Sequence, residues 1–75
     1  MNKEALNAAI AEEFEIDVTA ITPEASMKET LELDSLSLLD LIAVVEKVTG
    51  IKLKGAEVSH LVSFADLYAF LEQCS

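Results

Sequence analysis

Three kinds of side chain in this sequence could do chemistry: a serine that opens a helical pattern, a single histidine, and an excess of carboxylates. Ser35 and His60 could form a hydrolytic triad with an aspartate, in which the histidine would activate the serine hydroxyl. The available aspartates are Asp34 and Asp66. A chain of 75 residues has little material for the oxyanion hole and substrate pocket that this chemistry needs. We therefore predict that the protein is not an enzyme and has no catalytic residues.

The carboxylates and the one thiol do not indicate a metal site. The acidic residues lack the spaced Asp or Asn, Gly and Glu pattern of an EF-hand loop. Cys74 is the only cysteine, so no disulfide within the chain is possible, and no cysteine cluster indicates a zinc site. We predict no dedicated metal site, while weak binding of divalent cations to the acidic surface stays open. A single thiol fits a reducing compartment.

The charge of the chain indicates what kind of partner it meets. Fourteen acidic residues against five lysines give a net charge of −9. Such a surface repels nucleic-acid phosphates and anionic lipid headgroups, and it attracts basic patches on proteins. Acidity can also serve solubility alone. The sequence predicts protein partners with basic docking patches and no nucleic-acid ligand.

No segment indicates export or membrane insertion. The N-terminus runs directly into a helical pattern and lacks the apolar core of a signal peptide. The longest apolar run, Leu41 to Val45, is far too short to cross a bilayer. We predict a cytoplasmic protein without membrane insertion, and a monomer because no oligomerisation signal is present.

Ser35 must be positioned by the strongest helical pattern of the chain, from about Ser35 to Thr49. Asp34 and Ser35 are both good N-cap residues, and Gly50 stands where a left-handed residue commonly ends a helix. The apolar residues cover more than one stripe, which predicts either a central helix or one that shows apolar surface to a partner. They are Leu36, Leu38, Leu39, Leu41, Ile42, Val44, Val45 and Val48.

The segments on either side complete a helical domain. Leu6, Ile10 and Phe14 lie four residues apart in a predicted amphipathic helix from about Lys3 to Glu15. The stretch from 16 to 34 shows no sustained period and is predicted as a long loop with a turn at 22–24. Apolar residues should anchor this loop on the bundle: Ile16, Val18, Ile21, Leu31 and Leu33.

The C-terminal third predicts two further helices. Residues 51–53 are read as a loop, and 56–61 as a short helix. The last helix should begin after Ser63, with Asp66 completing an approximate capping box. The predicted fold is all-α: a small four-helix bundle of three main helices and one short helix, forming a single domain over 1–75.

Ser35 by itself has two interpretations. Serine at a helix start is most often an N-cap. A phosphate ester at the same place would face backbone N–H groups and the positive end of the helix dipole, so the position also tolerates an anionic modification.

The stretch from Leu31 through Leu36, LELDSL, resembles the phosphopantetheine attachment motif of acyl carrier proteins. The resemblance extends over nearly the whole chain, because the apolar pattern of residues 36–46 and the closing stripe of 64–71 follow in the family's order. It implies that a phosphopantetheinyl transferase, or holo-synthase, esterifies Ser35 with 4'-phosphopantetheine from coenzyme A. The arm would hold acyl groups as thioesters and deliver them to acyl-transferring and condensing enzymes of fatty-acid or polyketide biosynthesis.

The resemblance also implies a recognition surface on the helix that follows Ser35. The positions that match are Asp34, Leu36, Asp40, Ala43 and Glu46. Acidic members of this set would meet Lys and Arg on partners, and the others would fill the centre of the contact. The interpretation in which Asp40 and Glu46 only solvate a helix face stays open.

Three departures from the family pattern stand out. Glu32 replaces the usual glycine, and Leu38 places an apolar side chain where a polar one is common. We include Leu38 among the candidate partner-binding residues. Ser37 and Lys47 occupy positions that are often acidic, so a specialised polyketide, lipid-modifying or amino-acyl carrier is plausible beside a fatty-acid carrier. The alternative function is a helical docking module that is never modified, in which Ser35 only caps its helix.

Overall fold

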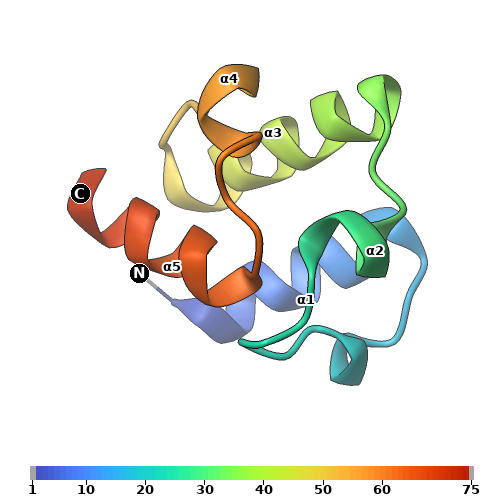
Figure 1. Ribbon diagram of the computed structural model, residues 1–75. Helices are drawn as coiled ribbons and strands as arrows, with labels where there is room; N and C mark the ends of the chain where they lie inside the picture. Colours follow the sequence, from blue (N-terminus) through green and yellow to red (C-terminus); the bar gives the residue numbers. More distant parts are fainter. Residues whose placement is uncertain (1, 75) are drawn as a thin grey trace.

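The structure is a computed structural model that describes residues 2–74. It contains five α-helices and a short 3₁₀ turn in the described range: α1 (Lys3–Phe14), η1 (Val18–Ala20), α2 (Met27–Leu31), α3 (Ser35–Thr49), α4 (Gly55–Val58) and α5 (Phe64–Cys74). Figure 1 shows the three long helices α1, α3 and α5 around a common interior, with α2 and α4 as short connecting helices. The prediction of a small all-α bundle with three main helices is confirmed.

The core is built from the apolar stripes that the sequence places on each long helix. Leu6 and Ile10 of α1, Leu41 and Val45 of α3, and Phe64 of α5 have no solvent exposure. Each such side chain contributes roughly 1.5–3 kcal/mol when it is fully removed from water. The core therefore joins α1, α3 and α5, and this packing holds α3 against the other two long helices.

The residues that end α3 and α2 both adopt the left-handed backbone conformation. Gly50 ends α3 at φ 77°, as the sequence predicted, and its N–H donates to the Glu46 carbonyl. Glu32 ends α2 in the same left-handed region, at φ 50°. A residue with a Cβ is disfavoured there, whereas glycine adopts this conformation freely. Glu32, which replaces the glycine usual in the family, thus occupies a left-handed position that favours glycine.

Replacing Glu32 with glycine is expected to raise the free energy of unfolding by about 0.5–1 kcal/mol, because the relief of left-handed strain exceeds the entropy that glycine adds to the unfolded chain. Urea unfolding of Glu32→Gly and Glu32→Ala measures this. The alanine variant removes the same charge but keeps the Cβ, so it should not gain this stability. Equal stabilisation by both substitutions would assign the effect to charge.

The long segment between α1 and α3 differs from the prediction in part. Residues 27–31 form α2, where the sequence analysis expected irregular structure around a turn. The Glu29 N–H donates to the Ser26 Oγ at 3.3 Å, so Ser26 caps this helix. A serine followed three residues later by glutamate is a helix-start signature, and Ser26 to Glu29 carried it.

The apolar residues predicted to anchor this segment differ in how far they are buried. Ile21 and Leu31 are buried, and Ile16 and Leu33 are partly buried against the core. Val18 lies in η1 and is 46% exposed, so its predicted role as an anchor was wrong. The segment is held to the C-terminal part as well, because the Met27 N–H donates to the Val62 carbonyl at 2.9 Å.

The last helix is capped as predicted, and it contacts α1. The Asp66 N–H donates to the Ser63 Oγ at 3.2 Å, while the Ser63 N–H donates to the Asp66 carboxylate at 3.2 Å. The Tyr68 hydroxyl of α5 donates to the Asn7 side chain of α1. Burial raises the pKa of this hydroxyl above its ordinary value, so the phenol stays protonated.

Candidate functional site at the start of α3

The start of α3 is fixed by Asp34 and not by Ser35. One Asp34 carboxylate oxygen accepts hydrogen bonds from the Leu36 N–H at 3.0 Å and the Ser37 N–H at 2.8 Å. Asp34 is therefore the N-cap, and Ser35 is the first helical residue. This removes the interpretation in which Ser35 serves as the cap. It also corrects the expectation of free backbone N–H groups, because Asp34 already occupies two of them.

Ser35 is left with a hydroxyl that faces solvent. The residue is exposed, and the hydroxyl makes no hydrogen bond within residues 2–74. A side chain at the first position of a 15-residue helix lies beside the positive end of the helix dipole. The position thus combines access for a modifying enzyme with a favourable field for an anionic ester.

The capping bonds also set the charge state of Asp34. The Ser37 N–H is the main cause that holds the pKa of the Asp34 carboxyl below its ordinary value of 3.8. Because the pKa is lowered by folding, the capping stability is complete above pH 3.8 and is lost as the pH falls through the lower folded-state pKa. At neutral pH the cap is an ionised carboxylate.

Replacing Asp34 with alanine is expected to lower the melting temperature by roughly 4–8 °C at pH 7, the usual effect of losing an N-cap in a domain of this size. Replacing Ser35 with alanine should change it little. Circular-dichroism melts of both variants measure the difference, and repeating them well below pH 3.8 should shrink the Asp34→Ala effect. A larger loss for Ser35→Ala than for Asp34→Ala would contradict the assignment of the cap.

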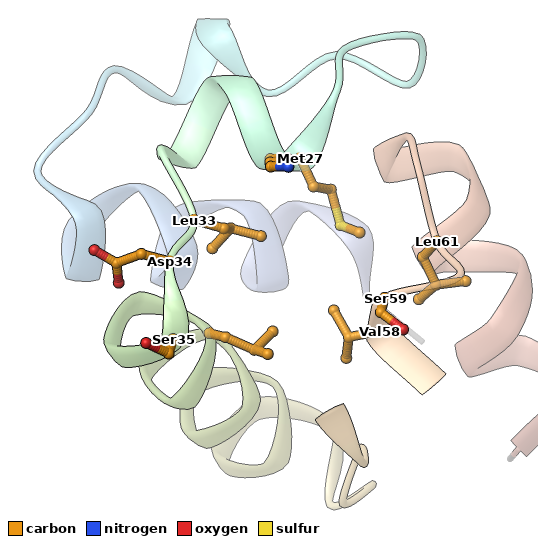
Figure 2. A pocket seen from close by; sticks show the side chains of 9 residues that line it. Met27, Leu33, Asp34, Ser35, Val58, Ser59 and Leu61 are labelled. Atoms are coloured by element: carbon orange, nitrogen blue, oxygen red, sulfur yellow. The ribbon is translucent and has the colours of Figure 1, made fainter. Parts of the chain in front are cut away.

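A cavity of about 280 Å³ opens beside Ser35, between α2, α3 and the α4 region. Figure 2 shows Met27, Leu33, Val58 and Leu61 directed into it, while the Asp34 carboxylate points away. Ser35 lies at its edge, and the lining also includes Lys28, Leu38 and Ser59. An apolar cavity with a reactive hydroxyl at its rim can shelter a flexible apolar group attached to that hydroxyl.

The predicted partner-binding residues separate into two sets. Asp34, Leu36, Asp40, Ala43 and Glu46 are all exposed. Leu38 is partly buried and lines the cavity instead. Leu39, which the sequence analysis did not select, is 62% exposed and lies three residues after Leu36, which is 76% exposed. The spacing of three residues was the signal that could have found Leu39.

The other candidates remain apart from any site. His60 is exposed in the loop after α4, and Asp66 is engaged in capping α5. Cys74 is an exposed free thiol in α5. Within residues 2–74 no group of three His, Cys, Asp or Glu side chains is placed to hold a metal ion. No described helix combines the length and apolar content needed to span a membrane.

Comparison with known proteins agrees with this geometry. A family model described as "Phosphopantetheine attachment site" matches residues 4–71, a range that contains Ser35 and the cavity. The chain is 32% identical over 71 residues to polyketide-8 synthase acyl carrier protein 2 of Streptomyces avermitilis, covering 95% of this chain and 82% of the relative. It is 30% identical over 69 residues to an acyl carrier protein of Helicobacter pylori, covering 92% and 88%.

A third relative, acyl carrier protein 2 of Ralstonia nicotianae, is 33% identical over 64 residues, covering 85% of this chain and 79% of the relative. None of these comparisons favours an unmodified docking module. Taken with a helical bundle that presents a free serine hydroxyl at the start of α3, they show that the chain belongs to the phosphopantetheine attachment family and to its acyl carrier proteins, which carry acyl groups without catalysing reactions.

Proposed function

We propose that Ser35 is the residue that receives 4'-phosphopantetheine and that the chain carries acyl groups through it. The observation that carries this proposal is the exposed, unbonded Ser35 hydroxyl at the first residue of α3, beside an apolar cavity. When bound, the group supplies a terminal thiol that holds acyl chains as thioesters. The family match over residues 4–71 supports a single carrier domain.

The residues around Ser35 suit this task. Asp34 holds the first turn of α3 in place, so the Ser35 backbone is fixed at the start of the helix and its side chain is presented to solvent. The helix dipole stabilises a phosphodiester at the same point, although Asp34 already uses two of the N–H groups. Met27, Leu38 and Val58 supply apolar surface for the carried chain within the cavity.

The exposed face of α3 forms the proposed docking surface for partner enzymes. Leu36 and Leu39 are its apolar centre, and Ala43 leaves space for a partner side chain. Asp40 and Glu46 flank this centre and would attract basic patches, which speeds encounter. Leu38 contributes through the cavity, where the structure places it.

The names of the relatives support a proposal about these partner enzymes. These relatives include an acyl carrier protein of a polyketide synthase and acyl carrier proteins named without a pathway. Our proposal is that a phosphopantetheinyl transferase and the acyl-transferring and condensing enzymes of fatty-acid or polyketide synthesis dock on the α3 surface. A cytoplasmic monomer is part of the same proposal.

Intact-mass measurement tests the proposal directly. Incubation of the protein with coenzyme A and a broad-specificity phosphopantetheinyl transferase should add the mass of one phosphopantetheine, and acyl-coenzyme A should add the acylated group in one step. The absence of any addition with several unrelated transferases would refute it.

A further inference from the structure

The cavity beside Ser35 has apolar walls and a single basic side chain. Met27, Leu33 and Val58 point into it, and Lys28 is the only cation among the described residues that line it. Its volume of about 280 Å³ lies just below the usual range of ligand pockets, roughly 300–1,000 Å³. The cavity therefore suits a short carried chain better than a long one.

Lys28 has no partner in the described chain. Its ammonium group makes no hydrogen bond, ion pair or ring contact within residues 2–74. Lys3, in contrast, lies 5.3 Å from the centre of the Tyr68 ring. The chain has fourteen acidic residues and five lysines, so its net charge is negative. Beside this cavity, Lys28 places a positive charge that has no ion-pair partner among the described residues.

Asp34 is the only carboxylate among the described residues that line the cavity, and it caps α3. Its carboxylate accepts hydrogen bonds from the Leu36 and Ser37 N–H groups and points away from the cavity. Lys28 belongs to α2, whereas Ser35 begins α3, so the two residues approach the cavity from different elements. The Asp34 carboxylate stays ionised but points away from the cavity, so an anionic group that enters along the apolar wall can reach Lys28 with no carboxylate directed at it from the described lining.

We infer that the cavity selects short acyl chains that end in a carboxylate, with Lys28 binding that carboxylate while the methylene groups pack on the apolar wall. This inference rests on the proposed attachment at Ser35. The phosphodiester of the arm would offer the same anionic oxygens, but it would be bonded to Ser35 at the rim and would make no use of the apolar wall. An acyl chain that ends in a carboxylate would contact both the apolar wall, through its methylene groups, and the Lys28 ammonium group, through its carboxylate.

The experiment compares two chains of equal length on the same carrier. Adipyl-coenzyme A and hexanoyl-coenzyme A are loaded onto the wild-type protein, Lys28→Met and Lys52→Met. Methionine keeps an unbranched side chain without the charge, and Lys52 is an exposed lysine outside the cavity lining, so its variant is the matched control. Cleavage of each thioester by hydroxylamine is followed by intact mass and normalised to the same acyl-coenzyme A free in solution.

The normalised adipyl thioester should be cleaved about two- to fivefold more slowly than the hexanoyl thioester, the size expected for a partly exposed ion pair. Lys28→Met should remove this difference, and Lys52→Met should retain it. Equal protection of both chains in the wild-type protein would overturn the inference. So would an equal effect of Lys28→Met on both chains, because that would assign Lys28 to the phosphodiester.

The loading step keeps this failure separate from that of the proposed function. If no acyl-phosphopantetheine mass appears on the wild-type protein, the attachment itself is refuted. If loading is complete and the two chains behave alike, the attachment stands and only the role of Lys28 is wrong.

Discussion

Replacing Ser35 with alanine is expected to abolish phosphopantetheine addition completely, with no measurable product by intact mass after complete conversion of the wild-type protein. The reason is chemical, since alanine has no hydroxyl to form the phosphodiester. Stability should change little, because Ser35 is exposed and does not cap α3. Identical circular-dichroism spectra of the two proteins would show that the lost modification is not a loss of fold.

Ser59 provides the matched control. It lines the same cavity and is exposed, but it lies at the end of α4 and not at the start of a long helix. Ser59→Ala should be modified as fast as the wild-type protein. Modification of the Ser35→Ala protein at any other residue, located by peptide mapping, would show that the attachment position was wrongly assigned.

Truncation of the exposed leucines on α3 is expected to weaken recognition by the phosphopantetheinyl transferase. Leu36→Ala and Leu39→Ala should each lower kcat/KM for modification by about five- to thirtyfold, the range for apolar residues at the centre of an interface. The physical reason is the loss of apolar area that the partner covers. Since the side chains are 76% and 62% exposed in the free protein, unfolding stability should not fall by a comparable amount.

Val18→Ala and Val62→Ala are the controls for this prediction. Val18 is 46% exposed in η1, and Val62 is 67% exposed before α5, so both remove apolar surface away from α3. Modification kinetics of the four variants, measured under one set of conditions, distinguish specific docking on α3 from non-specific apolar association. Equal losses for the leucine and valine variants would show that α3 holds no special docking surface.

Much of the fold follows from local sequence pattern. The spacing of Leu6, Ile10 and Phe14 predicted α1, and Gly50 predicted the end of α3. These predictions succeed because helical periodicity and capping act within a few residues of the chain. The overlooked α2 was equally local, since Ser26 and Glu29 form a helix-start signature within a segment that otherwise lacks periodicity.

Choosing between Asp34 and Ser35 as the cap required the structure. Both residue types are favoured at a helix start, so their identities do not distinguish them. The hydrogen bonds from Leu36 and Ser37 assign the cap to Asp34 and leave Ser35 free. Because Ser35 does not cap the helix, its hydroxyl is accessible to a modifying enzyme.

The sequence alone determined that Ser35 lies at the start of an apolar helix and that the surface is acidic, because both features depend only on residue types and their spacing. The roles of the neighbouring leucines depended on contacts between distant segments. Helical periodicity separates Leu38 from Leu39 by one step around α3, but only the packing of α2 and α4 determines which of them is covered. The cavity with its single lysine arises in the same way, since its walls come from three helices that meet only when the core has formed.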